Sequence, residues 1–127
     1  MATASCSEEK TGVATTLAKM AIAAKIKGEP IQIEGLLVAQ NDFPNQMDWF
    51  DAQKACASLG PGWRLPTQDE LKILYQNKDK IGGFARSYYW SSTEADSSSA
   101  WEHNFNDGLQ NFSSKGNPTY VRAIRAF

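Results

Sequence analysis

Apolar residues recur at helical spacing near the start of the chain and then change to a strand pattern. The members of the helical stripe, within residues 13–27, are Val13, Leu17, Met20, Ala21, Ala24 and Ile26. Such spacing places them near one helix face, and Gly28 and Pro30 are typical of a helix end. Ile31 and Ile33 then alternate with polar residues, and residues 36–39 are continuously apolar. This predicts a strand pair or one bulged strand, with Gly35 at the bend.

Two better-delimited helices are predicted in the middle of the chain. Asp48 is placed to cap the first, in which Trp49, Ala52, Cys56 and Leu59 share a face and which Gly60 ends. After Pro66, Thr67 and Glu70 have the spacing of a capping box. The apolar face of this second helix comprises Leu71, Leu74 and Tyr75.

The second half of the chain has the composition of strands. Residues 80–84 read as a turn, residues 87–93 as a strand, and residues 99–105 and 109–114 as a hairpin around Asn-Asp-Gly, a sequence that favours the positive φ angles of a tight turn. A terminal strand over 119–127 is expected to direct Val121, Ala123 and Arg125 to one side and Tyr120, Arg122, Ile124 and Ala126 to the other. This order of elements predicts an α+β fold with an antiparallel sheet.

The composition narrows the class of protein. A chain of 127 residues fits one domain with a core of its own, and a net charge of -1 argues against a nucleic-acid partner. Residues 13–27 are too short and too polar to span a membrane, and no signal peptide is visible at the start. We therefore expect a soluble protein without membrane insertion, with its location at the cell surface, in a virion or in the cytoplasm left open.

Little in the sequence supports catalysis or metal binding. Cys6 and Cys56 are too few for a disulfide framework and have no metal-ligand spacing, although they can pair if the N-terminal tail folds back. His103 is the only histidine, and in a polar hairpin it is expected at the surface rather than as a base. For Arg64, Arg122 and Arg125 ion pairs inside the domain are expected, with Asp69 or Glu70 as candidate partners.

Four blocks of sequence, in this order, resemble a known family. They are "GWRLPTQDEL", "YYWSSTE", the spaced Trp101, Phe105 and Gly108, and "YVRAIRAF". Together they resemble the C-type lectin-like domains at the C-terminus of bacterial collagen-like adhesins, and more closely the variable proteins of diversity-generating retroelements. The resemblance runs from about Ile31 to Phe127. It implies two helices that brace a small twisted antiparallel sheet in residues 31–127, with residues 1–30 forming an N-terminal tail and an extra helix.

The resemblance also implies a binding surface. In the retroelement proteins a reverse transcriptase introduces substitutions at adenines, so exposed positions vary and the scaffold stays fixed. The scaffold positions would be Trp90, Ser91, Ser92, Trp101, Phe105, Gly108, Tyr120, Val121, Arg122, Ile124 and Arg125. The expected ligand-binding residues are Arg86, Tyr88, Asp96, Ser97, Ser98, Ser99, Glu102, His103, Asn104, Asn106, Asp107, Gln110, Asn111, Ser113, Ser114, Gly116 and Pro118, of which Glu102, Gln110 and Pro118 fit the pattern less directly.

Aromatic residues suit such a surface. Tyr and Trp on a rigid sheet provide contact area at low entropy cost, while Ser, Asn and Gly provide adaptable hydrogen bonds. Tyr88, Tyr89 and Trp101 are candidate anchors, although for Trp90 and Trp101 a core position is the stronger expectation. Tyr88 and Tyr89 are adjacent, so one of them faces outward if they lie on a strand.

The resemblance further bears on chemistry and partners. The formylglycine-generating oxidases share the fold but need a cysteine pair in the C-terminal half, where this chain has none after Cys56. The Glu-Pro-Asn and Trp-Asn-Asp motifs of calcium-dependent lectins are also absent. We therefore expect no enzyme, no cofactor and no metal, and a protein or other macromolecular ligand.

Two alternatives stay open at this point. The polar positions are also those of any exposed hairpin, in which case the domain is a non-variable adhesion or structural domain of a cell-surface or phage assembly. The helix at 13–27 packs either on its own domain or on a partner subunit, and the second arrangement implies self-association.

Overall fold

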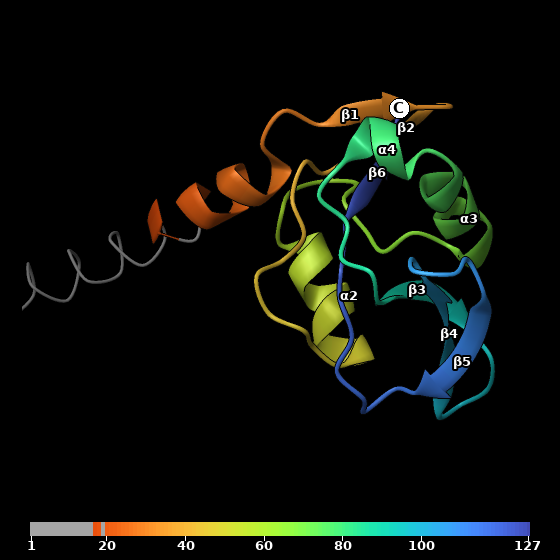
Figure 1. The fold of residues 1–127 in the computed structure, drawn as a ribbon. Helices are drawn as coiled ribbons and strands as arrows, with labels where there is room; N and C mark the ends of the chain where they lie inside the picture. Colours follow the sequence, from red (N-terminus) through yellow and green to blue (C-terminus); the bar gives the residue numbers. More distant parts are fainter. Residues whose placement is uncertain (1–16, 19) are drawn as a thin grey trace, which may run out of the picture.

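The computed structural model describes residues 17–18 and 20–127, which form four helical segments and two small antiparallel sheets (Figure 1). One sheet has the order β1-β2-β6 and the other β3-β4-β5. The strands are β1 (Ile31–Ile33), β2 (Leu36–Val38), β3 (Tyr88–Glu94), β4 (Ser99–Asn104), β5 (Gln110–Ser114) and β6 (Ile124–Ala126). The helices after the first are α2 (Trp49–Ala57), α3 (Gln68–Gln76) and α4 (Lys78–Ile81). The predicted α+β class is confirmed.

The first sheet joins the two ends of the domain. β1 and β2 form a hairpin around Glu34 and Gly35, whose φ angles of 46° and 84° are those of a tight two-residue turn. The prediction of a strand pair with Gly35 at the bend is confirmed. β6 pairs antiparallel with β2, with Ala126 opposite Leu36, so the C-terminal strand lies against the second strand of the N-terminal hairpin.

The predicted terminal strand over 119–127 is too long. Only Ile124–Ala126 form a strand, and residues 121–124 are all buried rather than alternating between two sides. Their backbone pairs instead with the loop after β2: Phe43 N donates to Val121 O and Ala39 N to Ala123 O. Because this segment runs through the interior, every side chain on it faces protein and the two-sided pattern disappears.

The N-caps of α2 and α3 are the ones that the sequence predicts, whereas α2 ends at Ala57 with Ser58 as its C-cap, before the predicted end at Gly60. Asp48 Oδ1 accepts a hydrogen bond of 2.8 Å from Asp51 N at the start of α2. In α3, Glu70 N donates to Thr67 Oγ1 over 3.2 Å and Thr67 N donates to Glu70 Oε1 over 2.8 Å, which closes the capping box. The short helix α4 was not predicted, because only its glycine-rich end at residues 82–83 gives a clear turn pattern.

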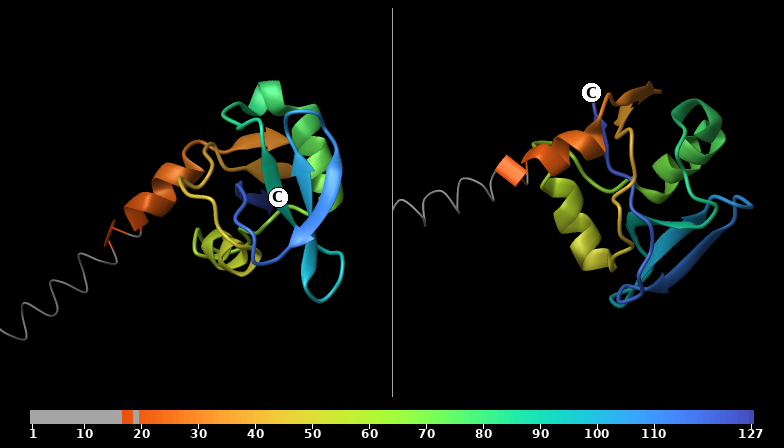
Figure 2. Two further views of the ribbon diagram at one scale, coloured as in Figure 1. Left: turned by 60° about the horizontal axis from the view of Figure 1, so that its bottom comes forward. Right: turned by 60° about the vertical axis from the view of Figure 1, so that its left-hand side comes forward.

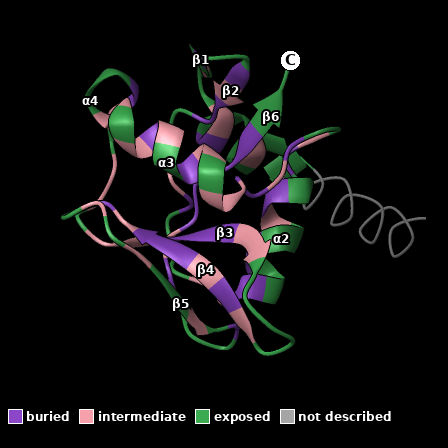
Figure 3. Cartoon of the chain, turned by 90° about the vertical axis from the view of Figure 1, so that its right-hand side faces the viewer, coloured by how far each residue is buried: buried purple, intermediate pink, exposed green. Residues whose placement is uncertain are grey.

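Two buried clusters hold the sheets and helices together. One centres on Trp49, Trp63 and Trp90 beside α2, and the other on Leu71, Leu74 and neighbouring aromatic residues beneath α3. Trp90 has no exposed surface, which confirms its predicted place in the core, and its indole N–H donates to Met47 O over 3.0 Å. The middle of β3, residues 89–91, is buried, whereas every residue of β5 is half-buried or exposed (Figure 3).

The first helix, described at residues 17–18 and 20–27, projects from the rest of the domain (Figures 1 and 2). Ile26 anchors it in the core, whereas Leu17, Met20 and Ile22 are 58%, 61% and 57% exposed. Of the predicted apolar stripe, Val13 lies outside the described residues. None of the described helices has the length and apolar character needed to cross a membrane. The boundary at residue 30 stays a prediction.

Candidate functional site

The β4–β5 hairpin forms the outer part of the second sheet, and its turn lies at the predicted Asn-Asp-Gly sequence, although only Gly108 of these three residues has a positive φ. Asn104 Oδ1 accepts from Asn106 N over 2.8 Å, and Asp107 Oδ1 accepts from Leu109 N over 3.0 Å. Gly108 has a φ of 82°, and a Cβ atom at this position would lie 2.7 Å from the Tyr75 ring. The turn therefore requires glycine both for its backbone angle and for the close approach of α3.

The register of the hairpin sorts its side chains onto two faces. Trp101 lies opposite Phe112 and His103 opposite Gln110, and these four side chains share one face of the sheet. Glu102 lies opposite Asn111 and Ala100 opposite Ser113 on the other face. The predicted binding residues on the strands are therefore divided between two faces rather than gathered on one.

An exposed aromatic pair marks the first face. The rings of Trp101 and Phe112 meet edge to face with centroids 5.5 Å apart, and Phe112 is 59% exposed while Trp101 is half-buried. The expectation of a core position for Trp101 is wrong, because this part of the face is only partly covered. The sequence also did not indicate that Phe112 lies at the surface, because its spacing from Trp101 and Phe105 is that of apolar residues that pack in the interior.

α3 covers the other end of the same face. Gln68 Nε2 donates to Gln110 Oε1 and Gln110 Nε2 donates to Gln68 O, both over 3.0 Å. Tyr75 packs on His103 with ring centroids 5.0 Å apart. The open part of the face thus begins where α3 begins, and the two glutamines border it.

His103 is buried, so the expectation of a surface histidine is wrong. It is 2% exposed and lies between the rings of Tyr75 and Phe105. Gln110 Nε2 lies 3.2 Å from its Nδ1, and because an amide nitrogen only donates, the ring proton resides on Nε2, which has no partner among the described residues. Burial lowers the pKa of His103, an effect that nearby Asp107 opposes and Lys72 reinforces.

Glu102 is buried as well. Its carboxylate faces the interior opposite Trp90 and accepts a hydrogen bond of 3.4 Å from Thr119 Oγ1. Burial raises its pKa. Neither Glu102 nor His103 offers its charged or polar atoms to a ligand in this structure, because both side chains fill space between the sheet and the elements that cover it.

Hydrogen bonds within the loop between β3 and β4, and from Lys115 below it, hold this loop in place. Asp96 Oδ1 accepts from Ser98 N over 2.8 Å, which shapes the exposed tip. Below it, the buried Lys115 places its ammonium 3.0 Å from Ser97 O, 2.8 Å from Glu94 Oε2 and 4.5 Å from the centre of the Trp49 ring. Lys115 was not predicted to have a role, because a lone lysine after a strand gives no indication of its partners.

The remaining predicted binding residues differ in exposure. Those that are exposed are Arg86, Asp96, Ser97, Ser98, Asn106, Asp107, Asn111, Ser114, Gly116 and Pro118. Those that are half-buried are Tyr88, Ser99, Asn104, Gln110 and Ser113. A polar hollow of about 470 Å³ beside α4 brings Arg86 and Asn106 together with Lys78 and Asp79.

Two of the three predicted structural arginines, the half-buried Arg64 and the buried Arg122, form ion pairs inside the domain. Arg64 binds Glu70 through both oxygens, at 2.6 and 2.9 Å, which confirms one of its two candidate partners. Arg122 Nε lies 2.6 Å from Asp42 Oδ1, a partner that the sequence did not indicate, whereas Arg125 is exposed. The buried Tyr89 hydroxyl also donates to Asp42 and accepts from Ala85 N, so Tyr89 is a core residue and the half-buried Tyr88 is the outward one of the pair.

Possible metal-ligating side chains do not gather in the part of the chain that the structure describes. Within residues 17–18 and 20–127 no three His, Cys, Asp or Glu side chains lie close enough together to hold a metal ion. Cys56 is buried and has no disulfide partner among the described residues, and burial raises the pKa of its thiol to about 12, so it is a poor nucleophile. Cys6 lies outside the described residues, and its pairing is untested.

Comparison with solved structures identifies the fold. Botrocetin, a C-type lectin-like protein, matches with a TM-score of 0.59 and 11% sequence identity over 79% of this chain and 98% of its own. A complex of a mutant von Willebrand factor A1 domain with botrocetin matches with a TM-score of 0.57 and 11% identity, over the same shares. The fold is therefore C-type lectin-like, as predicted. No curated protein matches the chain significantly.

The sequence itself identifies the family. The model of the Lcl C-terminal domain matches residues 15–125, which is most of the chain and includes the first helix, both sheets and the candidate binding surface. The chain thus belongs to the family of Lcl C-terminal domains.

Proposed function

We propose that this domain binds a protein or other macromolecular ligand through the outer part of the β4–β5 hairpin, without catalysis. The observation that carries the proposal is the aromatic pair of the half-buried Trp101 and the exposed Phe112, on a sheet that packs against the core. Two large aromatic side chains that meet solvent lose favourable burial, which a ligand restores. We call the side chains of Trp101, Phe112, Gln110 and Ser114 the aromatic face.

The surroundings of the aromatic face suit recognition. Gln110 and Ser114 flank Phe112 on the same face of the sheet. The exposed Asn111, between Gln110 and Phe112 in sequence, lies on the other face. An aromatic centre with a rim of uncharged hydrogen-bonding groups is the usual anatomy of a binding hot spot. One structure of similar fold is a complex of botrocetin with another protein, which supports a protein as the ligand.

The finer form of the proposal is that this surface is diversified, as in retroelement variable proteins. The exposed tip at residues 96–98, the turn at 106–107 and the exposed positions of β5 all hold residues that adenine substitutions produce from Asn codons. Deep sequencing of the gene segment for residues 85–127, with its flanking DNA, tests this form. Substitutions at adenines of the polar codons, with Trp90, Phe105 and Gly108 unchanged, support it. An invariant segment, or equal variation at scaffold codons, favours a fixed adhesion or structural domain.

Binding itself is tested by affinity capture with quantitative mass spectrometry. Wild-type protein is compared with the double variant Trp101→Ala/Phe112→Ala and with Phe50→Ala, which removes a 54% exposed aromatic ring from α2 instead. The proposal predicts a partner that the wild type and Phe50→Ala capture and the double variant loses. A set of partners that is identical for all three proteins contradicts it.

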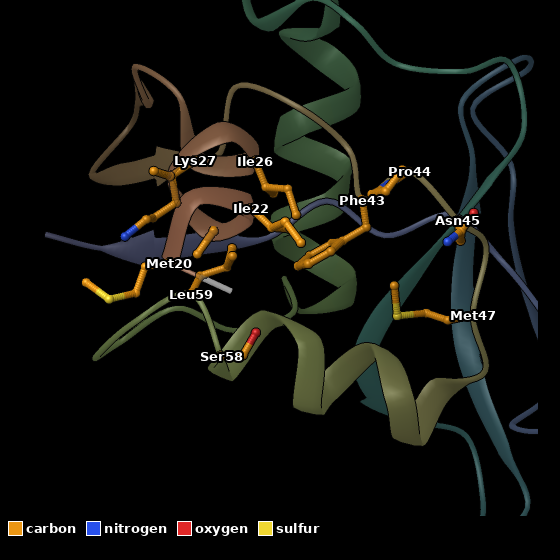
Figure 4. A pocket seen from close by; sticks show the side chains of 12 residues that line it. Met20, Ile22, Ile26, Lys27, Phe43, Pro44, Asn45, Met47, Ser58 and Leu59 are labelled. Atoms are coloured by element: carbon orange, nitrogen blue, oxygen red, sulfur yellow. The ribbon is translucent and has the colours of Figure 1, made fainter. Parts of the chain in front are cut away.

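We propose separately that the first helix associates with a second copy of this chain. Leu17, Met20 and Ile22 are more than half exposed, and a groove of about 890 Å³ beside the helix is lined by Met20, Ile22, Phe43 and Met47, among others (Figure 4). A helix of this length needs packing partners to be stable. Light scattering on wild type and on Met20→Ser/Ile22→Ser tests this, with Phe127→Ser as the control. A wild-type monomer contradicts it.

A further inference from the structure

We infer that the outer edge of β5 accepts an extended segment of a partner protein as an added strand. The inference rests on the proposed function, because it names the class of ligand that the aromatic face recognises. It depends on backbone groups, however, whereas the aromatic face depends on side chains, so the two can fail separately.

The hydrogen-bond pattern leaves the outer side of β5 open. Asn104 N donates to Leu109 O and Lys115 N donates to Ser98 O, which fixes the alternation along the hairpin. In the register of β4 and β5, Asn111 and Ser113 therefore turn their N–H and C=O groups toward β4. Gln110, Phe112 and Ser114 turn theirs away from it.

These outward groups have no backbone partner in the part of the chain that the structure describes. The exception is Ser114 O, which accepts from Asn117 N over 2.9 Å. The N–H groups of Gln110, Phe112 and Ser114 and the C=O groups of Gln110 and Phe112 remain. They form a row with the spacing of a β-ladder, to which an extended peptide is complementary.

The opposite edge of the same sheet is closed, which shows that the opening is specific to β5. Trp90 N donates to Tyr120 O and Tyr120 N donates to Tyr88 O, so the segment before β6 covers the edge of β3. β5 lies at the outside of the domain, and none of the other described elements lies beyond it (Figures 1 and 3).

β5 also lacks the features that normally keep an edge strand from pairing. Its sequence, QNFSS, contains no proline and no charged residue, and the irregularity in the sheet lies in β3 rather than β5. Lys115 follows directly, but its ammonium is buried against Glu94 and does not guard the edge. An unguarded edge of five residues is long enough for a ladder of several bonds.

The side chains of β5 indicate the kind of segment. A residue of the added strand beside Phe112 meets an exposed ring next to Trp101, where an aromatic or β-branched side chain gains most. Its neighbours meet Asn111 and Ser113 on the other face, which carry no charge. The expected partner is therefore an extended, uncharged segment with large apolar residues at alternate positions.

The test uses a phage-displayed library of random twelve-residue peptides, selected on the whole chain. Affinities of the selected peptides are measured for Ser114→Pro, which removes an outward N–H, and for its matched control Ser114→Ala, which keeps it. We expect Ser114→Pro to weaken binding roughly tenfold or more relative to Ser114→Ala, because both variants lose the hydroxyl of the aromatic face but only the former loses a backbone bond and adds a ring at the edge. Amide exchange of the wild type, followed by NMR, is independent of how well the variant folds. The peptide should slow the Gln110, Phe112 and Ser114 amides.

Three results would overturn the inference. The first is that no peptide is enriched, or that the enriched ones do not slow these amides. The second is that binding is lost in Phe112→Ala but unchanged in Ser114→Pro, which leaves the proposed function standing and removes the added strand. The third is that the free protein already pairs two copies through β5, seen as a dimer that Ser114→Pro abolishes.

Discussion

Lys115 and Glu94 form an ion pair in which only one partner is buried. The two side-chain atoms lie 2.8 Å apart, the lysine side chain is 6% exposed and the glutamate side chain 56%. Lys115 also binds Ser97 O and lies over the Trp49 ring, so a single ammonium joins α2, the end of β3 and the β3–β4 loop. The exposed tip of the candidate surface is thus shaped by a residue that does not belong to the surface.

Replacing Lys115 should loosen that tip. Lys115→Met keeps most of the apolar stem but removes the charge, and we expect it to lower the free energy of unfolding by about 1–3 kcal/mol. Amide exchange at residues 95–98 should accelerate more than exchange in β2. Lys54→Met, at an exposed position of α2, is the matched control and should change stability little. Equal exchange rates at 95–98 in the variant and the wild type would remove Lys115 from this role.

Two glycine substitutions should differ in effect. Gly35 and Gly108 both have positive φ, 84° and 82°, but a Cβ atom at Gly35 meets nothing within 4 Å and one at Gly108 lies 2.7 Å from Tyr75. Gly35→Ala should cost about 1–2 kcal/mol of stability for backbone strain alone. Gly108→Ala should cost about 1–3 kcal/mol more, because α3 must also shift. Thermal or urea unfolding measures both, and equal losses would show that α3 does not press on the turn.

Stability should fall in mild acid because of His103. The pKa of the folded histidine lies below its ordinary value of 6.5, so the unfolded chain binds the proton more tightly. The stabilisation is present above pH 6.5 and is lost as the pH falls through the folded pKa. Protonation also adds an N–H at Nδ1 of His103. This N–H faces the amide nitrogen of Gln110, which is a donor as well and cannot accept it.

The contribution of His103 can be separated from that of the buried acids. Asp42 and Glu102 have raised pKa values, mainly through burial, and therefore act in the opposite direction. The difference in unfolding free energy between wild type and His103→Leu, measured in urea at pH 7.5 and pH 5.5, isolates the histidine. We expect wild type to lose more stability than the variant on acidification, and parallel losses would contradict this.

The buried pair of Arg122 and Asp42 should be sensitive to the loss of one partner. The Arg122 side chain has no exposed surface and also donates to Ala39 O and Gly82 O. Asp42→Asn leaves the guanidinium without its counter-charge, and we expect a loss of about 3–5 kcal/mol. The double variant Asp42→Asn/Arg122→Met should recover part of that loss. If Arg122→Met lowers the free energy of unfolding as much in the Asp42→Asn background as it does in the wild type, the two residues are not coupled.

Local signals in the sequence predicted the local structure well. Thr67 and Glu70 fix the start of α3 whatever surrounds it, because the capping box is made within one turn. The turns at Gly35 and at Asn-Asp-Gly likewise depend on backbone angles and hydrogen bonds within a few residues. The C-type lectin-like fold was predicted from the four sequence blocks that resemble a known family, and not from these local elements taken singly.

Burial depended on tertiary contacts that no local pattern reveals. His103 and Phe112 lie on the same face of one hairpin, yet α3 covers the first and leaves the second open. Residues 121–124 look like part of an alternating strand but run through the interior, where protein surrounds them on both sides. The charge partners of Arg122 and Lys115 are distant in sequence, so their roles appear only in three dimensions.

The most direct measurement of the central claim is the affinity of a captured partner for single variants of the aromatic face. Biolayer interferometry would compare wild type with Trp101→Ala, Phe112→Ala and the control Phe50→Ala, after circular dichroism shows that each is folded. If the ligand binds the aromatic face, we expect a loss of about 2 kcal/mol or more, roughly thirtyfold in Kd, for at least one of the first two and none for the control. Unchanged affinity in both Trp101→Ala and Phe112→Ala would place the ligand elsewhere and contradict the account.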